Sequence, residues 1–115
     1  MSARPLQEPS FLILTALAAG PQHGYAILAE VARISDGQVT LLTGTLYAAL
    51  DRLQGDQLID TDREEIVEGR ARRYYRLTSD GAQRLAAETA RLRRHADAAA
   101  ARLASFDPRF AAEPA

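Results

Sequence analysis

The chain carries the segment TGTLYAALDRLQG at residues 43–55, followed closely by LIDTDREEIVEGRARRYYRL at residues 58–77. In the first segment Leu46, Leu50 and Leu53 recur at helical spacing, which predicts a helix with one apolar face. The opposite face is small and nearly uncharged, so it favours close approach to another molecule over solvation. That face comprises Thr45, Ala48, Ala49 and Arg52, with Tyr47 near its edge.

The second segment predicts two strands, at residues 58–63 and 71–77, joined by an acidic loop at residues 64–70. We therefore expect a hairpin with a long tip. In its second strand Tyr75 and Leu77 share one face, which we expect to pack on the core. The other face carries Arg72, Tyr74 and Arg76.

Three more helices surround this unit. The first two are predicted at residues 10–19 and 23–34, and a long final helix at residues 80–105. Ser10 is the expected N-cap of the first helix, and Thr78 or Ser79 that of the last. Thr43 is the expected N-cap of the third helix, because Leu42 has no capping oxygen. A short extended piece is expected at residues 38–41, and His23 is expected to act as a turn or cap residue.

The first helix is apolar on all sides, so it requires apolar neighbours on more than one side. One neighbour is its own domain, and a partner chain is the candidate for the other. The final helix carries a heptad seam typical of paired helices, formed by Leu85, Thr89, Leu92, Ala96, Ala99 and Leu103. The seam could also pack on its own domain, but a long helix joined to a small domain favours dimerisation.

Charge is unevenly distributed along the chain. The net charge is -1, which by itself argues against nucleic acid as a partner. However, residues 60–68 are strongly acidic, whereas residues 70–76 hold four arginines and no acid. Arginines on a hairpin can reach DNA phosphates, while a small-faced helix can enter the major groove. Alternatively, these arginines guard an exposed strand edge, and the winged helix acts as a protein-interaction adaptor without DNA-binding activity.

Other function classes find little support. Apolar residues make up 47% of the chain and charged residues 25%, as in an ordinary globular domain. There is no cysteine, no glycine-rich phosphate loop and no convergent acid–base set, so we expect neither enzyme activity nor a cofactor or metal. The apolar run at residues 11–19 is too short to cross a membrane, and we expect a cytoplasmic protein.

Three ordered motifs carry a resemblance to a known family. They are LxxGPxHGYxI at residues 17–27, GTLYxxLxRL at residues 44–53, and GRxRRYYxLTxxG at residues 69–81. With these motifs the chain resembles the PadR (phenolic-acid-decarboxylase-type) transcriptional regulators over residues 10–103. Its length resembles the short subgroup with one C-terminal helix.

The resemblance implies a homodimeric winged helix, usually a repressor, which a small molecule or stress signal releases from DNA. It also implies that Tyr25, Thr45, Tyr47 and the wing arginines lie near DNA. Some members bind flat aromatic compounds at the dimer interface, so a small apolar or aromatic effector is expected here. This chain departs from the family in having Leu42-Thr43 where a serine or asparagine and then a proline often precede the third helix.

The sequence thus predicts a mainly α (α+β) winged helix-turn-helix at residues 10–78, with three helices and a two-stranded wing. A dimerisation helix follows at residues 79–105, and flexible tails are expected at residues 1–9 and 106–115. Double-stranded operator DNA is the expected partner. The predicted DNA-binding residues are Tyr25, Thr43, Thr45, Tyr47, Arg52, Arg70, Arg72 and Arg73. The predicted dimer interface comprises Phe11, Leu12, Leu85, Leu92, Ala96, Ala99 and Leu103.

Overall fold

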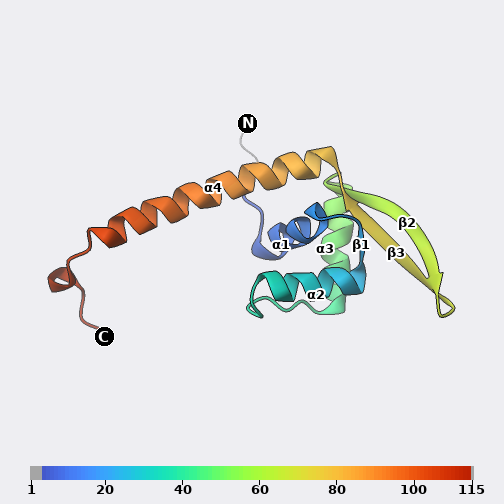
Figure 1. The fold of residues 1–115 in the computed structure, drawn as a ribbon, viewed down its shortest axis with the longest axis horizontal. Coiled ribbons are helices and arrows are strands. Elements are labelled where there is room, and N and C mark those ends of the chain that lie inside the picture. The colour runs from blue at the N-terminus through green and yellow to red at the C-terminus, as the bar shows by residue number, and fades with distance from the viewer. Residues whose placement is uncertain (1–3, 115) are drawn as a thin grey trace.

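The computed structural model describes residues 4–114, with helices and strands in the order expected of a winged helix (Figure 1). The predicted fold class is confirmed, although the sheet has three strands. Residues 1–3 and 115, at the ends of the two expected tails, lie outside the described residues. The elements are α1 (Glu8–Ala18), β1 (Gln22–His23), α2 (Gly24–Ile34), α3 (Thr43–Gly55), β2 (Ile59–Val67), β3 (Arg70–Leu77), α4 (Ser79–Ala104) and the short 3₁₀ helix η1 (Pro108–Phe110).

Helix α1 occupies the centre of the core, between α2 and α4 (Figure 1). It also contacts α3 and β3, so apolar neighbours from its own chain surround it. This explains why nearly every residue of α1 is apolar. The largest fully buried side chains come from α1, α2, α3 and β2: Ile13, Leu14, Leu17, Ile27, Val31, Leu46, Leu50 and Ile59.

Helix α1 begins at Glu8, two residues earlier than predicted, so Ser10 is not its N-cap. Gln7 takes that position without a side-chain cap, and Pro9 lies in the first turn, where a missing N–H costs nothing. Glu8 and Pro9, assigned above to a tail, are therefore helical. Ser10 is buried instead.

The starts of α2 and α3 differ in their capping. His23 caps α2, because its Nδ1 accepts a hydrogen bond from Ala26 N–H at 3.3 Å, as its predicted cap role requires. Helix α3 begins at Thr43 with Leu42 as an N-cap that makes no side-chain hydrogen bond. The predicted cap role of Thr43 is therefore wrong, since Thr43 is already the first helical residue. Residues 38–41, expected to be extended, form no strand.

The sheet is antiparallel in the order β1-β3-β2. Strands β2 and β3 pair along their whole length and join through Glu68 and Gly69, whose φ values are 53° and 78°. Two consecutive left-handed residues form the tight turn typical of a hairpin. The predicted long loop is therefore wrong: the acidic segment continues β2, because its carboxylates lie opposite the arginines of β3. Strand β1, which was not predicted, pairs with Tyr74 and Tyr75.

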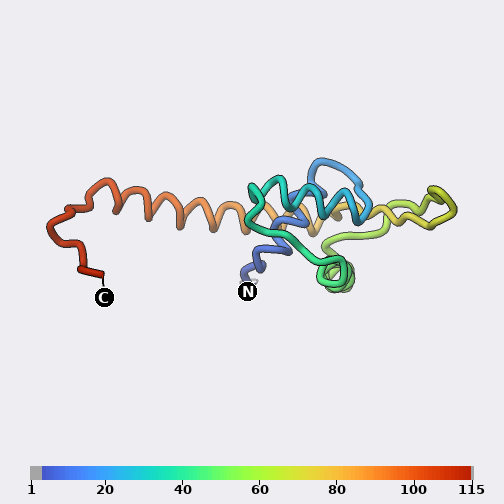
Figure 2. The backbone as a smooth tube through the Cα atoms, turned by 90° about the horizontal axis from the view of Figure 1, so that it is seen from below, coloured from blue at the N-terminus to red at the C-terminus, as the bar shows by residue number. Residues whose placement is uncertain are grey.

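Helix α4 leaves the domain as a long projection. The Oγ1 atom of Thr78 caps it by accepting a hydrogen bond from Gly81 N–H at 2.9 Å. Its second half extends beyond the other elements, which gives the molecule extents of 64 × 34 × 22 Å (Figure 2). No helix among residues 4–114 is long and apolar enough to cross a membrane. Past α4, η1 interrupts the expected C-terminal tail.

Candidate nucleic-acid interface

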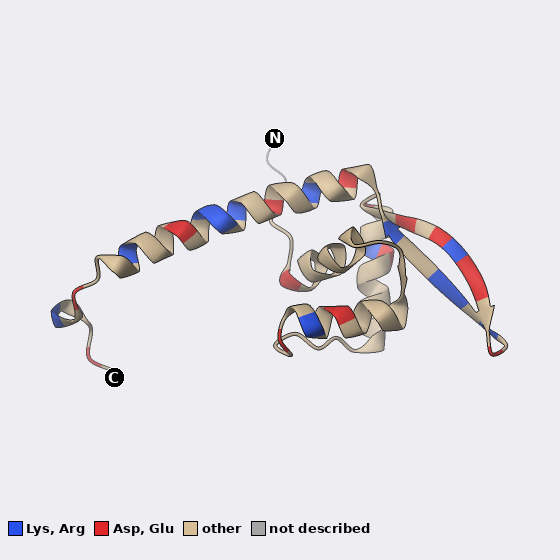
Figure 3. Cartoon of the chain, viewed as in Figure 1, with Lys and Arg blue, Asp and Glu red and all other residues tan. Residues whose placement is uncertain are grey.

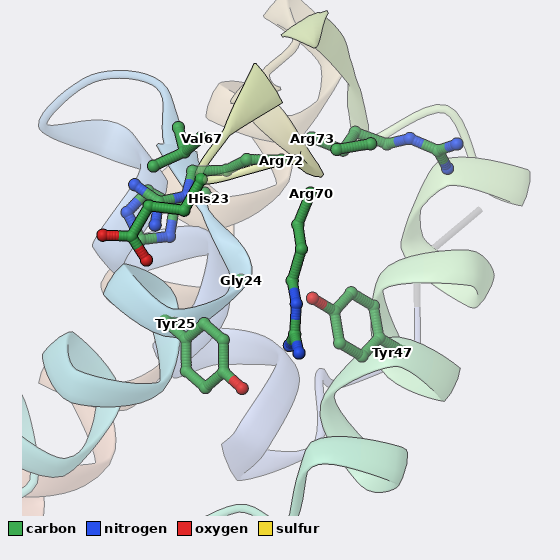
Figure 4. A pocket seen from close by; sticks show the side chains of 10 residues that line it. His23, Gly24, Tyr25, Tyr47, Val67, Arg70, Arg72 and Arg73 are labelled. Carbon is green, nitrogen blue, oxygen red and sulfur yellow. The ribbon is translucent and has the colours of Figure 1, made fainter. Parts of the chain in front are cut away.

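A cleft of about 460 Å³ separates the wing from the start of α2 and the exposed side of α3 (Figure 4). It brings together five of the eight predicted DNA-binding residues. Its lining comprises His23, Gly24, Tyr25, Tyr47, Val67, Glu68, Arg70, Ala71, Arg72 and Arg73.

The two tyrosines stand on opposite sides of this cleft. Tyr25 is 71% exposed at the start of α2, and Tyr47 is 41% exposed on α3. The Tyr47 ring lies against Gly24, where any Cβ would be 2.5 Å from the Tyr47 Oη atom. The absence of a side chain at residue 24 therefore allows the Tyr47 ring to pack at this position. From the wing, the Arg70 side chain extends into the space between the two tyrosines (Figure 4).

Most wing arginines have an acidic neighbour on β2. The Nε atom of Arg73 lies 3.7 Å from Oε2 of Glu64, and Nη2 of Arg76 lies 3.6 Å from Oδ2 of Asp60. Residues 59–77 contain five arginines and five acidic residues, and Figure 3 shows both signs mixed along the hairpin. Within residues 4–114, neither Arg70 nor Arg72 forms an ion pair. Of the wing arginines, these two are the ones without a carboxylate oxygen of the described residues within ion-pair distance, although Glu65 lies opposite Arg72 on β2.

A stack of side chains fixes the wing to α2. The rings of His23 and Tyr74 meet edge to face with centroids 5.3 Å apart, and the Arg63 guanidinium lies 3.9 Å from the Tyr74 ring centroid. Burial lowers the pKa of His23, and the nearby Arg72 lowers it further. The lowered pKa favours the neutral imidazole, whose Nδ1 accepts the hydrogen bond from Ala26 N–H. Arg63 could not be singled out in the sequence, because the β2–β3 register places it on Tyr74.

The first two turns of α3 form an exposed surface next to the cleft. Predicted residues Thr43 and Thr45 are both exposed there, and Leu42 before them is 77% exposed. Ala49, which the sequence suggested would share this face, is 3% exposed and belongs to the core. The reason is that Ala49 lies beside Leu46 and Leu50 on the buried side of the helix.

Arg52 does not line this cleft. Its Nη2 atom lies 3.5 Å from Ser10 Oγ, and it lines a separate hollow with Pro5 and Arg84. It thus faces the N-terminal segment and α4, one turn farther along α3 than the cleft. The helical spacing placed Arg52 on the polar side of α3, but it could not show which other segments this side of the helix contacts.

The predicted dimer residues divide into two groups. Leu12 is 7% exposed and Leu85 packs against the core, so the chain itself buries Leu12 and partly buries Leu85. Leu92 and Leu103 are 40% and 71% exposed. Phe11 and Leu92 line a groove of about 410 Å³ with seven other residues: Leu6, Glu8, Leu12, Ser35, Gln38, Val39 and Arg91. Ala96 and Ala99 are exposed farther along α4.

The buried carboxylate of Glu88 was missed by the sequence analysis. Glu88 is 5% exposed, accepts a hydrogen bond from Leu6 N–H at 2.6 Å and forms an ion pair with Arg91. The hydrogen bond from Leu6 is the main cause that lowers its pKa. Glu88 thereby ties the N-terminal segment to α4. Its position beside the heptad seam resembles that of a solvated residue, so nothing in the local sequence signals this role.

The α2–α3 pair, the hairpin and the cleft between them define a winged helix-turn-helix protein. A family model described as the transcriptional regulator PadR-like family matches residues 13–87. The chain therefore belongs to the PadR-like family, and the resemblance carried by its motifs is confirmed.

Solved structures share this fold. The chain is 27% identical to a PadR family transcription regulator from Clostridium difficile R20291, with a TM-score of 0.71 and coverage of 84% of this chain and 99% of that one. Bacillus subtilis PadR in complex with operator DNA is similar in fold, with 24% identity, a TM-score of 0.61 and coverage of 69% and 46%.

Curated relatives are matched over part of their length. An uncharacterized protein X from Lysinibacillus sphaericus is 30% identical over 70 residues, which are 61% of this chain and 64% of that protein. An uncharacterized 37.1 kDa protein in transposon TN4556 of Streptomyces fradiae is 46% identical over 52 residues, or 45% of this chain. The match spans 14% of that relative.

Proposed function

We propose that this protein is a transcriptional repressor that binds a pseudo-palindromic operator as a homodimer. The observation that carries the proposal is the cleft between α3 and the wing, into which the unpaired Arg70 extends between Tyr25 and Tyr47. Family membership and the fold shared with an operator-bound regulator support it.

On DNA the two sides of the cleft have different tasks. Helix α3 enters the major groove with its N-terminal turns, where helix-turn-helix proteins contact base edges. Arg70 and Arg72 contact phosphates, which position the protein without reading sequence. Arg73 contributes less to phosphate binding, because its side chain points away from the cleft (Figure 4) and Glu64 lies near its guanidinium.

A second copy covers the outer half of α4. Leu92 and Leu103 on α4 and Phe106 just past its end are exposed at 40%, 71% and 54%. The seam alanines between the two leucines, Ala96 and Ala99, allow close approach of another helix. A two-fold dimer would place two copies of α3 about one helical turn of DNA apart, or a multiple of that. Leu92→Glu should give monomers in light scattering, since a charge at a helix seam is buried unpaired. A folded Leu92→Glu dimer would show that the seam is assigned wrongly.

We further propose that a small apolar or aromatic effector binds near this interface. The groove beside Phe11 and Leu92 supports the idea, because its lining combines apolar side chains with the polar groups of Ser35 and Arg91. An effector bound there should weaken DNA binding. A ligand whose bound structure lies at the wing instead would contradict this proposal.

The experiment that tests DNA binding compares variants over a series of salt concentrations. Duplexes selected from a random library by the full chain, and scrambled controls, are titrated by fluorescence anisotropy. Arg72→Ala should weaken both duplexes together and reduce the log–log salt slope by about 1.8, from one phosphate contact per subunit. Arg76→Ala is the matched control: Asp60 and Asp62 lie near Arg76, so the slope should change less.

Tyr47→Ala completes this test. It should reduce the preference for the selected duplex by about 1–3 kcal/mol per affected base pair and leave the slope nearly unchanged. If Arg72→Ala alters sequence preference but not the slope, the wing reads bases and the assignment is reversed.

The alternative function is a protein-interaction adaptor. The balanced charge of the wing favours it, because equal numbers of arginines and acids weaken long-range attraction to DNA. The adaptor becomes the better interpretation if the full chain selects no duplex, or if neither Arg72→Ala nor Tyr47→Ala affects its binding to DNA.

A further inference from the structure

The DNA-facing end of α3 lacks the side chains that usually identify bases. Guanine is commonly read by paired hydrogen bonds from arginine or lysine, and adenine by those from asparagine or glutamine. In the first two turns of α3 no such side chain is present. The exposed residues there are Leu42, Thr43, Gly44, Thr45, Tyr47 and Ala48.

The long polar side chains farther along α3 are engaged elsewhere. Arg52 meets Ser10 near the N-terminal segment. Gln54 donates from Nε2 to Thr61 Oγ1 on β2 at 3.3 Å. Asp51 is exposed, but its negative charge opposes the phosphates on either side of the groove. None of the three is available to form the paired contacts described above.

What remains at this end of the helix is a set of methyl groups and hydroxyls. Leu42 is 77% exposed, and Ala48, six residues later, is also exposed. Thr45 carries one methyl and one hydroxyl between them. At Gly44 a Cβ would meet nothing within 4 Å, so the surface between these residues is open. In the major groove only thymine presents a methyl group.

We propose that α3 recognises thymine through its 5-methyl group, with Leu42, Thr45 and Ala48 as the specificity-determining residues. The inference rests on the proposed function, in which α3 enters the major groove. It assigns thymines to the part of each operator half-site that lies under the N-terminal end of α3. Leu42 occupies the N-cap position of α3 but makes no capping hydrogen bond. A contact with thymine would explain why an exposed leucine lies there.

The test removes single methyl groups from DNA. A duplex selected from a random library by the full chain is resynthesised with deoxyuridine in place of one thymine at a time. Affinity should fall about fourfold at each contacted thymine, the effect expected for one buried methyl group. Replacement of a contacted thymine–adenine pair by cytosine–guanine should lower affinity, and 5-methylcytosine at that position should restore part of it.

Matched variants identify the protein side of the contact. Leu42→Ala should abolish the deoxyuridine effect at one position of each half-site and leave the others unchanged. Thr45→Ser removes the methyl and keeps the hydroxyl, whereas Thr45→Val does the reverse. We expect Thr45→Val to retain discrimination between thymine and uracil, and Thr45→Ser to lose it. Both residues are exposed, so these variants should fold like the parent chain.

The outcomes separate this inference from the proposed function. A selected duplex that tolerates deoxyuridine at every position would overturn thymine recognition and leave DNA binding intact. Sensitivity that persists unchanged in Leu42→Ala and Thr45→Ser would also overturn it, because the methyl contact would then lie elsewhere. If no duplex is selected at all, the proposed function fails and this inference fails with it.

Discussion

The two halves of α4 share one helix and one heptad pattern, yet they lie in different surroundings. In the first half Gly81 and Glu88 are buried and Leu85 packs against the core. In the second half, from Leu92 onward, every residue of the helix is exposed (Figure 2). The first half is therefore part of the domain, whereas the second can gain packing only from another molecule.

This difference separates helix stability that comes from tertiary packing from helix stability that comes from local residue propensity. An isolated helix is marginal in water, and most helical stability in proteins comes from tertiary packing of one face. The outer half of α4 has no such packing within residues 4–114. Its alanines favour the helix locally, and a partner copy would add the missing burial. The comparison between the two halves of α4 can be tested by substitutions in one half only, and by substitutions in α3, which lies outside both.

The largest effect is expected from Gly81→Ala. A Cβ at Gly81 would overlap the backbone carbonyl oxygen of Leu58 and lie 2.8 Å from Leu77 Cδ1. Because backbone cannot easily give way, the free energy of unfolding should fall by about 3 kcal/mol or more. Urea denaturation at fixed protein concentration measures it. In the control Gly55→Ala nothing lies within 4 Å, so stability should rise by up to about 1 kcal/mol. Equal urea midpoints for both variants would refute the close approach.

The next effect compares leucines in the two halves. Leu85→Ala should lower the free energy of unfolding by about 2 kcal/mol, because part of its side chain packs on the core. Leu103→Ala should change the stability of the monomer by less than about 0.5 kcal/mol, since the side chain is 71% exposed. Sedimentation should nevertheless show weaker self-association for Leu103→Ala. The opposite ranking would mean that the domain boundary along α4 is misplaced.

A smaller effect with a defined pH dependence is expected for Glu88→Gln. The folded-state pKa of Glu88 lies below its ordinary value of 4.5, so its stabilising contribution is present above that value. The contribution is lost as pH falls through the lowered folded-state pKa. At pH 7 the variant should be less stable by about 1–2 kcal/mol, because a hydrogen-bonded charge is removed.

The pH profile distinguishes this role from simple packing. As the pH falls below the ordinary carboxyl pKa of 4.5, the parent chain should lose stability faster than Glu88→Gln, so the two unfolding curves converge. The control is Asp97→Asn in the exposed half of α4, which should follow the parent curve. A constant difference between the parent and Glu88→Gln across this range would argue against a charged Glu88 in the fold.

The smallest effect is expected at the start of α3, which lies outside both halves of α4. Leu42→Ser supplies the missing N-cap of α3 and should raise the free energy of unfolding by about 1 kcal/mol. If Leu42 contacts thymine, the same variant should bind the selected duplex more weakly. Leu42→Ala, which supplies no cap, should weaken binding without the gain in stability. An unchanged urea midpoint for Leu42→Ser would indicate that solvent already satisfies the start of α3.

Much of the fold follows from local patterns. The spacing of Leu46, Leu50 and Leu53 predicted α3, although its start was misplaced by one residue, and alternation in β3 placed Tyr75 in the core. Charge was harder to interpret. The acidic segment at residues 64–67 resembles a loop by composition, and only pairing with β3 shows that it is a strand.

The candidate site was predictable in its outline but not in its members. Tyr25, Tyr47 and Arg70 come together as the motifs indicate, whereas Arg52 faces the N-terminal segment. Composition also could not separate Arg72 from Arg73, because the carboxylate near Arg73 comes from the opposite strand.

The sequence by itself determined the helices, the hairpin and the family, because periodicity, capping and turn residues act over a few neighbouring positions. Only the tertiary structure decided which arginines remain unpaired, that Glu88 is buried, and where along α4 the domain ends. Each of these depends on contacts between residues far apart in the chain. Leu6 and Glu88, for example, are 82 positions apart. Such contacts arise where distant segments pack together, and short-range periodicity does not show which side chains that packing brings into contact.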